Sequence, residues 1–234
     1  MKKLLGVVGG TLLFAGSALA ADLPARPAYK APPIMAPVVY NWTGFYIGGN
    51  VGGVWDTATV TDSLFGFSVS DTKSGFIGGG QIGYNWQVSP QFVLGVEWMF
   101  DGTSLSSSFA TSDGAGNSFS GNAKVNWLTT VTGRLGYASN NWLFYVKGGG
   151  GWVHESASAT AVDVNGNVFG AGGSDTNGGW VAGGGIEYGF TPNWTARVDY
   201  QHLGLTDQTV NGFADSLTLS RHFDMVTFGL NYKF

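Results

Sequence analysis

The sequence predicts an all-β fold, namely an eight-stranded antiparallel β-barrel that spans a membrane. Three observations support this prediction. Apolar and polar residues alternate with period two in eight stretches of the chain, which is typical of strands with two unlike faces. Short turns alternate along the chain with long polar connections. Charged residues make up only 11% of the 234 residues, against roughly 25% in an ordinary soluble domain.

The composition excludes several other classes of protein. Aromatic residues make up 15% of the chain and the net charge is only −4, the reverse of a disordered chain. The absence of cysteine excludes a disulfide scaffold and a cysteine-ligated metal site. A nucleic-acid-binding protein has a basic surface, whereas this chain is acidic. The 39 glycines, about 17% against a usual level of roughly 7%, fit the wall of a narrow barrel.

The first 20 residues have the features of a secretory signal peptide. Lys2 and Lys3 form a positive segment, Leu4–Leu13 is apolar, and Ala18-Leu19-Ala20 is a small-residue cleavage site. The alternative, a retained membrane anchor, needs about 20 apolar residues, and this stretch is shorter. Removal of residues 1–20 takes away two lysines and leaves a net charge of −6.

Residues 21–41 are rich in proline and alanine and hold five of the seven prolines of the chain. Proline-rich segments are extended, so we interpret residues 21–41 as a periplasmic linker. The barrel is expected over residues 42–234.

We expect the eight strands near residues 43–55, 75–88, 92–101, 124–137, 142–154, 178–190, 194–202 and 223–234. Three connections are short and contain the turn formers Pro and Asn, namely Ser89-Pro90-Gln91, Ser139-Asn140-Asn141 and Thr191-Pro192-Asn193. The other four are long and polar, near 56–74, 102–123, 155–177 and 203–222. Short turns at one end and long polar loops at the other are typical of outer-membrane barrels.

Large apolar side chains share one face of each predicted strand. In the second to fourth strands this face consists of Ile82, Tyr84, Trp86 and Val88, then Phe92, Leu94, Val96, Trp98 and Phe100, then Val125, Trp127, Val131, Leu135 and Tyr137. In the fifth to seventh strands it consists of Trp142, Phe144, Val146 and Trp152, then Trp180, Ile186, Tyr188 and Phe190, then Trp194, Ala196, Val198 and Tyr200. The last strand continues the pattern with Val226, Phe228, Leu230 and Tyr232.

The charged residues inside these strands fall on the opposite face. Four are acidic and four are basic: Glu97, Asp101, Glu187 and Asp199, and Lys124, Arg134, Lys147 and Arg197. An Arg or Lys that faces lipid at midplane costs roughly 2–4 kcal/mol, so the aromatic face is the one expected to meet lipid. The interior of an eight-stranded barrel is just wide enough for side chains to fill it. The balanced charges therefore predict a packed polar plug and no general diffusion pore.

A soluble barrel shows the same alternation with its polar face outside. Here the polar face is mostly Gly, Thr and Asn, which suit a crowded lumen better than a solvated surface. Aromatic residues also follow the short turns directly, at Phe92, Trp142 and Trp194, where an interfacial girdle belongs. These observations favour the membrane.

The chain ends on an aromatic strand with Phe234 as its last residue, and we interpret this ending as a signal for the barrel-assembly machinery. The segments Trp42–Asn50, Leu143–Gly150 and Phe228–Phe234 resemble the RopB-type outer-membrane proteins of alphaproteobacteria. The resemblance covers nearly the whole chain. It implies an eight-stranded barrel of the OmpA/OmpX type in the cell outer membrane, with a surface or envelope-integrity role and without a shared catalytic motif.

Two glycine-containing motifs have a possible binding role. Gly78–Gly83 fits G-x-G-x-x-G, but the dinucleotide motif needs a helix that opens at it, and here it lies inside a predicted strand. Asp163–Asn167 resembles the start of a calcium loop but lacks the glycine and the closing glutamate that such a loop requires. A strand and a turn, respectively, are the favoured interpretations.

Three histidines, His154, His202 and His222, are expected at the long-loop rim of the barrel. They are candidates for a metal or haem site, although ordinary polar rim residues explain them equally well. Arg221 and Lys73 nearby are candidates for contacts with lipopolysaccharide phosphates. His154 and Ser156 share a face, as do the catalytic pairs of barrel lipid A deacylases.

None of these candidates is strong enough to assign a catalytic, cofactor-binding or metal-binding residue. We predict a non-enzymatic structural protein of the outer membrane. It supports envelope integrity and meets its surroundings through four long extracellular loops. Its expected partners are outer-membrane lipid and lipopolysaccharide, with a homo-oligomer left open and nucleic acid excluded. The alternatives are a small channel or a haem or ligand receptor, and then a lipid A-modifying enzyme.

Overall fold

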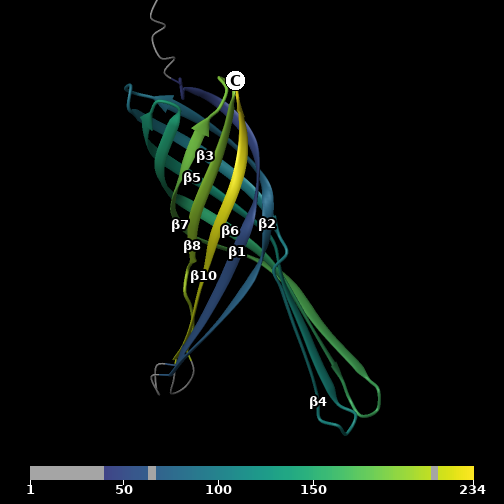
Figure 1. Cartoon of the computed structure of the whole chain (residues 1–234). Coiled ribbons are helices and arrows are strands. Elements are labelled where there is room, and N and C mark those ends of the chain that lie inside the picture. The colour runs from purple at the N-terminus through teal and green to yellow at the C-terminus, as the bar shows by residue number, and fades with distance from the viewer. Residues whose placement is uncertain (1–39, 63–66, 212–215) are drawn as a thin grey trace, which may run out of the picture. The chain divides into compact units, whose positions relative to one another are not determined.

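The computed structural model describes residues 40–62, 67–211 and 216–234 (Figure 1). The predicted signal peptide and the linker up to residue 39 lie outside the described residues. Among the described residues, no helix is long and apolar enough to cross a membrane. The structure there consists of β-strands joined by turns.

The described residues form ten strands in one antiparallel sheet. They are β1 (Gly44–Asp62), β2 (Phe67–Gln87), β3 (Phe92–Thr103), β4 (Ser106–Ser112), β5 (Ser118–Ser139), β6 (Trp142–Val162), β7 (Val168–Gly189), β8 (Trp194–Leu205), β9 (Gln208–Asn211) and β10 (Ser216–Lys233). Eight of them close a ring in the order β1-β2-β3-β5-β6-β7-β8-β10, because β10 pairs with β1. The predicted eight-stranded antiparallel barrel is confirmed.

The two additional strands are continuations of the wall and do not widen the ring. β4 pairs with β5 beyond the end of β3, and β9 pairs with β10 beyond the end of β8. Each therefore extends a strand position that the barrel already has.

The three predicted short turns are confirmed between β2 and β3, β5 and β6, and β7 and β8. In the second of these turns Asn140 has a φ of 54°, a left-handed conformation that asparagine tolerates better than most residues. The first and third close on Phe92 and Trp194, whose carbonyl groups accept backbone hydrogen bonds across the turn.

The expectation of four long loops is wrong for most of the residues concerned. The stretches near 56–74, 102–123 and 155–177 are largely antiparallel strand, and only short turns remain at their tips. The alternation of apolar and polar residues is weak in these stretches, because they consist mainly of Ser, Thr, Ala and Gly. They nevertheless form strands, because pairing between strands satisfies the backbone N–H and C=O groups. In Figure 1 these extensions leave the barrel at the end opposite to the short turns.

The two faces of the barrel wall follow the prediction with one exception. Glu97, Arg134 and Arg197 are buried in the lumen, while large aromatic side chains are exposed on the outer wall. The exception is strand β5, where a bulge between Val125 and Trp127 changes the alternation. Val125 is therefore buried in the lumen and Lys124 is exposed, the reverse of the prediction.

Glycine on the lumen side makes room for the polar interior. A Cβ on Gly83 would lie 2.4 Å from the ring of Tyr46, and one on Gly185 would lie 2.7 Å from the hydroxyl of Tyr145. Both tyrosines reach the centre of the lumen because these two positions have no side chain.

Candidate functional site

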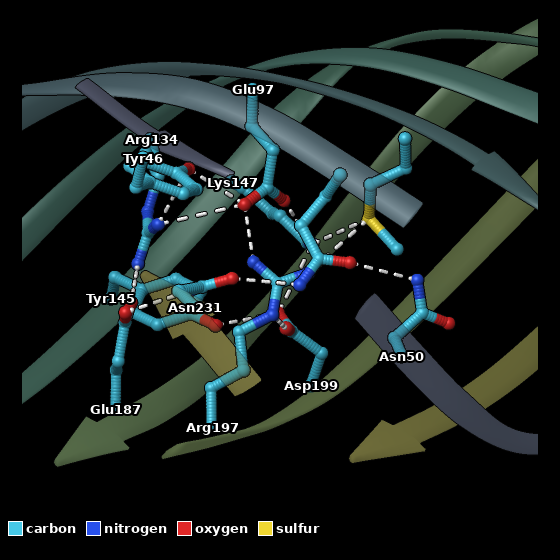
Figure 2. A network of polar contacts seen from close by, with 12 residues as sticks. Tyr46, Asn50, Glu97, Arg134, Tyr145, Lys147, Glu187, Arg197, Asp199 and Asn231 are labelled. Carbon is cyan, nitrogen blue, oxygen red and sulfur yellow. Dashed lines mark hydrogen bonds and ion pairs between the residues drawn. The ribbon is translucent and has the colours of Figure 1, made fainter. Parts of the chain in front are cut away.

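The centre of the lumen holds a buried network of charged side chains (Figure 2), and Glu97 of β3 lies in its middle. One carboxylate oxygen accepts from Arg197 and from the Tyr46 hydroxyl at 2.7 Å, and lies 3.5 Å from Arg134 Nη1. The other oxygen accepts from Lys147 Nζ at 3.1 Å. A single carboxylate thus meets three cations from three different strands.

Two further carboxylates complete the balance of charge. Glu187 Oε2 lies 2.7 Å from Arg134 Nη2. Asp199 lies 3.0 Å from Lys147 Nζ and 2.8 Å from Arg197 Nε. The six charged side chains are at most 3% exposed. Three positive and three negative groups therefore neutralise one another out of contact with water.

Neutral side chains hold this charged cluster in place. The ring of Tyr145 stacks 3.9 Å from the guanidinium carbon of Arg134, and its hydroxyl donates to Asp199 at 2.7 Å. Glu187 accepts from Thr195 at 2.5 Å and from Asn231 at 2.8 Å. Buried charges that are both paired and hydrogen-bonded resist rearrangement, because removal of one partner leaves the other uncompensated.

A chain of amides links this cluster to Asp101, the fourth acidic residue of the lumen. Asn50 donates to Asp101 at 2.9 Å and to Gln81 at 2.9 Å. Gln81 in turn donates to Asn231 at 2.7 Å. The polar layer therefore extends over four neighbouring strands, from β3 to β10.

Apolar side chains close the lumen at both ends of the polar layer. At the short-turn end, Tyr40 and Trp42 are buried together with Val93, Leu143 and Tyr145. At the other end a larger cluster fills the lumen: Val54, Ile77, Leu105, Val125, Leu128, Val153, Val181, Leu203, Phe223 and Met225. Two apolar layers with a neutralised polar layer between them leave the lumen filled with side chains.

The short-turn end is sealed by the residues just before β1. The backbone N–H of Trp42 donates to Gln87 Oε1 at 3.0 Å, and the Lys233 ammonium lies 4.6 Å from the ring centroid of Tyr40. A Cβ on Gly189 would lie 2.4 Å from the Tyr40 ring. Tyr40, close to the end of the predicted linker, thus lies in the barrel interior.

At the opposite mouth, above the larger apolar cluster, Arg221 lies between two carboxylates. Its Nη2 is 2.5 Å from Asp56 and its Nη1 is 2.5 Å from Glu155. The guanidinium that is a candidate for contacts with lipopolysaccharide phosphates is thus already paired with two carboxylates. Lys73, the other candidate, lies 3.0 Å from Asp71.

Two β-sheet arms extend beyond this mouth (Figure 1). The β1–β2 arm consists of Asp56–Asp62 of β1, Phe67–Phe76 of β2, β9 and Ser216–Arg221 of β10. The β5–β6 arm consists of β4, Ser118–Val125 of β5, Glu155–Val162 of β6 and Val168–Gly178 of β7. In Figure 1 the two arms diverge, with the β5–β6 arm at the lower right.

Each tip turn of the β5–β6 arm is closed by an aspartate and an asparagine. Asp163 accepts from the backbone of Asn165 and Asn167 at 2.8 Å, and Asp113 accepts in the same way from Ala115 and Asn117. Asp163 therefore lies in a turn, as predicted, and its carboxylate accepts hydrogen bonds from that turn. Hydrogen bonds from the side chains of Asn117 and Asn167 are the main cause of a lowered pKa of Asp113 and of Asp163, respectively.

The three histidines do not form one site. His202 and His222 lie together, with ring centroids 5.1 Å apart, and His202 Nδ1 is 2.9 Å from Asp224. His154 stacks on Trp127 on another part of the wall. Within the described part of the chain, no group of three His, Cys, Asp or Glu side chains is arranged to hold a metal ion.

The remaining candidates have structural partners. His154 Nδ1 lies 2.9 Å from the Thr176 hydroxyl, while the Ser156 hydroxyl accepts from Asn126 at 3.0 Å. The two side chains thus lack the mutual hydrogen bond that a base and a nucleophile need. Gly78–Gly83 lies within β2, as predicted.

Comparison with known proteins agrees with this architecture. Residues 12–234 match the family described as outer membrane protein beta-barrel domain. The chain is 34% identical over 232 residues to the 31 kDa outer-membrane immunogenic protein of Brucella melitensis biotype 1, with 95% of each chain covered. It is 31% identical over 198 residues to the 22 kDa outer membrane protein of Rhizobium leguminosarum bv. viciae, which covers 83% of this chain and 79% of the relative.

Two solved structures of small surface proteins are also similar. The attachment invasion locus protein Ail of Yersinia pestis matches with a TM-score of 0.38 and 13% identity, over 82% of this chain and 99% of Ail. Neisserial surface protein A matches with a TM-score of 0.41 and 15% identity, over 82% of this chain and 98% of that protein.

Proposed function

Because the chain belongs to the outer membrane protein β-barrel domain family, we propose that it is a non-conducting structural anchor that presents its arms at the cell surface. Short turns of such barrels lie in the periplasm, so the two arms are extracellular. The anchor supports envelope integrity, and the arms carry out surface interactions.

The observation that carries this proposal is the filled lumen. A channel needs a continuous polar path, whereas here ten buried apolar side chains lie between the polar layer and the extracellular mouth. The polar layer itself is neutralised by ion pairs at 2.7 to 3.1 Å, such as Arg134–Glu187 and Lys147–Glu97. This packing of the described residues opposes the passage of water and ions.

Conductance in planar lipid bilayers tests the anchor. We expect purified protein to insert without stable conductance steps, while a porin measured in the same bilayers gives them. Porin-sized steps from the pure protein would contradict the proposal. The envelope role is tested by sensitivity of a deletion strain to detergent, with complementation as the control.

We also propose that the barrel-assembly machinery recognises the end of β10. Phe234 is 69% exposed, and its ring lies 5.1 Å from Tyr232 and 5.9 Å from Phe45. These contacts leave most of the terminal ring accessible. We expect Phe234→Ala to lower the amount of barrel in the outer membrane, measured against Phe228→Ala, which removes an exposed aromatic residue from within β10.

A further inference from the structure

The two arms are amphipathic, and their apolar faces continue the lining of the lumen. On β6, alternation leads without interruption from the buried Val153 to Glu155, Ala157, Ala159 and Ala161. Side chains paired across the ladder share a face, so Phe119 of β5 and Phe169 of β7 lie on the same side as Ala161. We call this side the inner face of the β5–β6 arm.

The inner face is apolar although it lies outside the barrel. Phe109 also belongs to it, since it pairs with Gly121 and its ring covers that glycine. Phe109, Phe119 and Phe169 are 56%, 43% and 63% exposed. The outer face of the same arm carries mostly hydroxyl and amide groups: Ser106, Ser108, Ser118, Ser120, Asn122, Ser156, Ser158, Thr160, Ser174 and Thr176.

The β1–β2 arm has the same two faces. Its inner face continues from the buried Val54 through Asp56 and Ala58 to Val60, which pairs with Val69 and with Leu219. The same face also carries the charged side chains of Asp71, Lys73 and Arg221. Its outer face carries hydroxyl pairs such as Thr59 with Ser70 at 2.9 Å. Exposed apolar side chains on both inner faces thus border the space above the mouth, and exposed apolar patches mark interaction sites.

The inner faces meet at the base of the arms in a pocket of about 400 Å³. Ala157 and Gly173 line it from the β5–β6 arm, and Leu219 from the β1–β2 arm. Glu155, Asp175 and Arg221 also line it, with Arg221 paired to Glu155. We call the pocket and the two inner faces above it the cleft.

The net charge of the protein is concentrated around this cleft. The described residues of the two arms and their connections hold eight carboxylates and three cations. The carboxylates belong to Asp56, Asp62, Asp71, Asp113, Glu155, Asp163, Asp175 and Asp207, and the cations to Lys73, Lys124 and Arg221. The lowered pKa of Asp113 and Asp163 keeps the tips charged in mildly acidic solution. An occupant of the cleft must therefore be apolar on its surface of contact and positive around it.

We propose that the cleft binds a cationic amphipathic peptide, an inference that rests on the proposed surface role of the arms. The apolar side of the peptide lies against the phenylalanines of the inner face, and its basic side chains pair with the acidic border. The dimensions fit, because Glu155–Val162 rises about 23 Å as a strand and a 15-residue helix is about 22 Å long. Acidic peptides and anionic lipids are disfavoured by the same border.

The test measures binding of a fluorescent 15-residue leucine–lysine peptide, with its lysines on one helical face, to the full protein in zwitterionic nanodiscs. We expect saturable binding that weakens on going from 0.1 to 1 M salt, as the Debye length falls from about 10 to about 3 Å. A scrambled peptide of the same composition and a leucine–glutamate peptide are expected to bind at least about tenfold more weakly.

Two pairs of variants test the apolar contacts and the charge pairing separately. Phe119→Ser with Phe169→Ser removes apolar surface, and its matched control, Val162→Ser with Val168→Ser, changes the outer face of the same arm. Glu155→Gln with Asp175→Asn removes two carboxylates from the pocket, with Asp224→Asn on the outer wall as control. We expect about tenfold weaker binding for each test variant and less than about twofold for each control.

Equal binding by all variants, or by the scrambled or glutamate peptide, would overturn the proposal. Circular dichroism of each variant confirms that the arms have kept their strands. A failure here is distinguishable from failure of the anchor, because bilayer conductance does not depend on what the arms bind.

Discussion

The lumen and the cleft are lined by the same faces of the same strands, yet one is closed and the other open. In the lumen the ring brings opposite walls together, so that Glu97 of β3 meets Arg197 of β8. In the arms the wall divides into two separate extensions of the sheet, and Phe169 is 63% exposed on a face that is buried lower down. Ring closure, and not composition alone, decides whether an inward-facing side chain is buried.

The largest expected effect comes from breaking the polar layer. Glu97→Ala leaves three buried cations without their common partner, so we expect a loss of about 3–5 kcal/mol in the free energy of unfolding. Urea unfolding in lipid vesicles measures it. Lys124→Ala, on the exposed side of the bulge, is the control and should stay within about 0.5 kcal/mol of the parent. An equal effect of both changes would contradict the description of the lumen.

The apolar layer above it should respond to truncation in a similar way. Leu203 is fully buried, and Leu203→Ala creates a cavity that is expected to cost about 2–5 kcal/mol. The same unfolding assay applied to Phe169→Ala, an inner-face residue of the arm, should give a change within about 0.5 kcal/mol. The comparison fails if the arm residue matters as much as the lumen residue.

Glycines sharpen the comparison between the two sides of the wall. Gly83→Ala pushes a Cβ into the Tyr46 ring and is expected to cost about 1–3 kcal/mol. Gly133→Ala is the matched control, because its Cβ would face outward with the nearest atoms at 3.9 Å. Similar losses for both variants would show that the lumen is less tightly packed than described.

The smallest effect concerns the arm tips. Hydrogen bonds from Asn117 and Asn167 lower the pKa of Asp113 and Asp163. Each carboxylate therefore stabilises its turn at a pH above 3.8, the ordinary pKa of Asp. This stabilisation is lost as the pH falls through the lowered values. Titration of the carboxyl carbons by NMR should give midpoints below 3.8. Midpoints at or above that value would mean that the turns are open.

The strands of the wall were predictable because period-two alternation is strong where one face meets lipid. The arms were not predictable in this way. Ser118–Ala123 and Ser156–Ala161 do alternate, but mostly between small polar and small apolar residues, so the contrast in hydrophobicity between their two faces is weak. The apolar signal there rests on a few phenylalanines such as Phe119. The bulge at Val125 has no signature in the local sequence, so the direction of Lys124 was assigned wrongly.

The content of the polar layer was predictable, but its pairing was not. Alternation placed Arg134 and Glu187 on the inner face, yet they are 53 positions apart in the chain and meet only through the stagger of the closed barrel. Tyr46 and Tyr145 were missed as members of the network. The signal for them is present, since each tyrosine lies on the polar face of its strand. Tyr46 lies four residues before Asn50, and Tyr145 lies two residues before Lys147.

Cysteine labelling tests the contrast between lumen and cleft most directly, because the chain has no cysteine of its own. Single variants Thr132→Cys in the lumen and Ala157→Cys on the inner face are treated with a membrane-impermeant maleimide in intact vesicles or cells. Thr132 is 2% exposed, whereas Ala157 lines the pocket at the base of the arms. We predict rapid labelling at position 157 and none at position 132 until the barrel is unfolded. Rapid labelling at position 132 in the folded protein would contradict the sealed lumen.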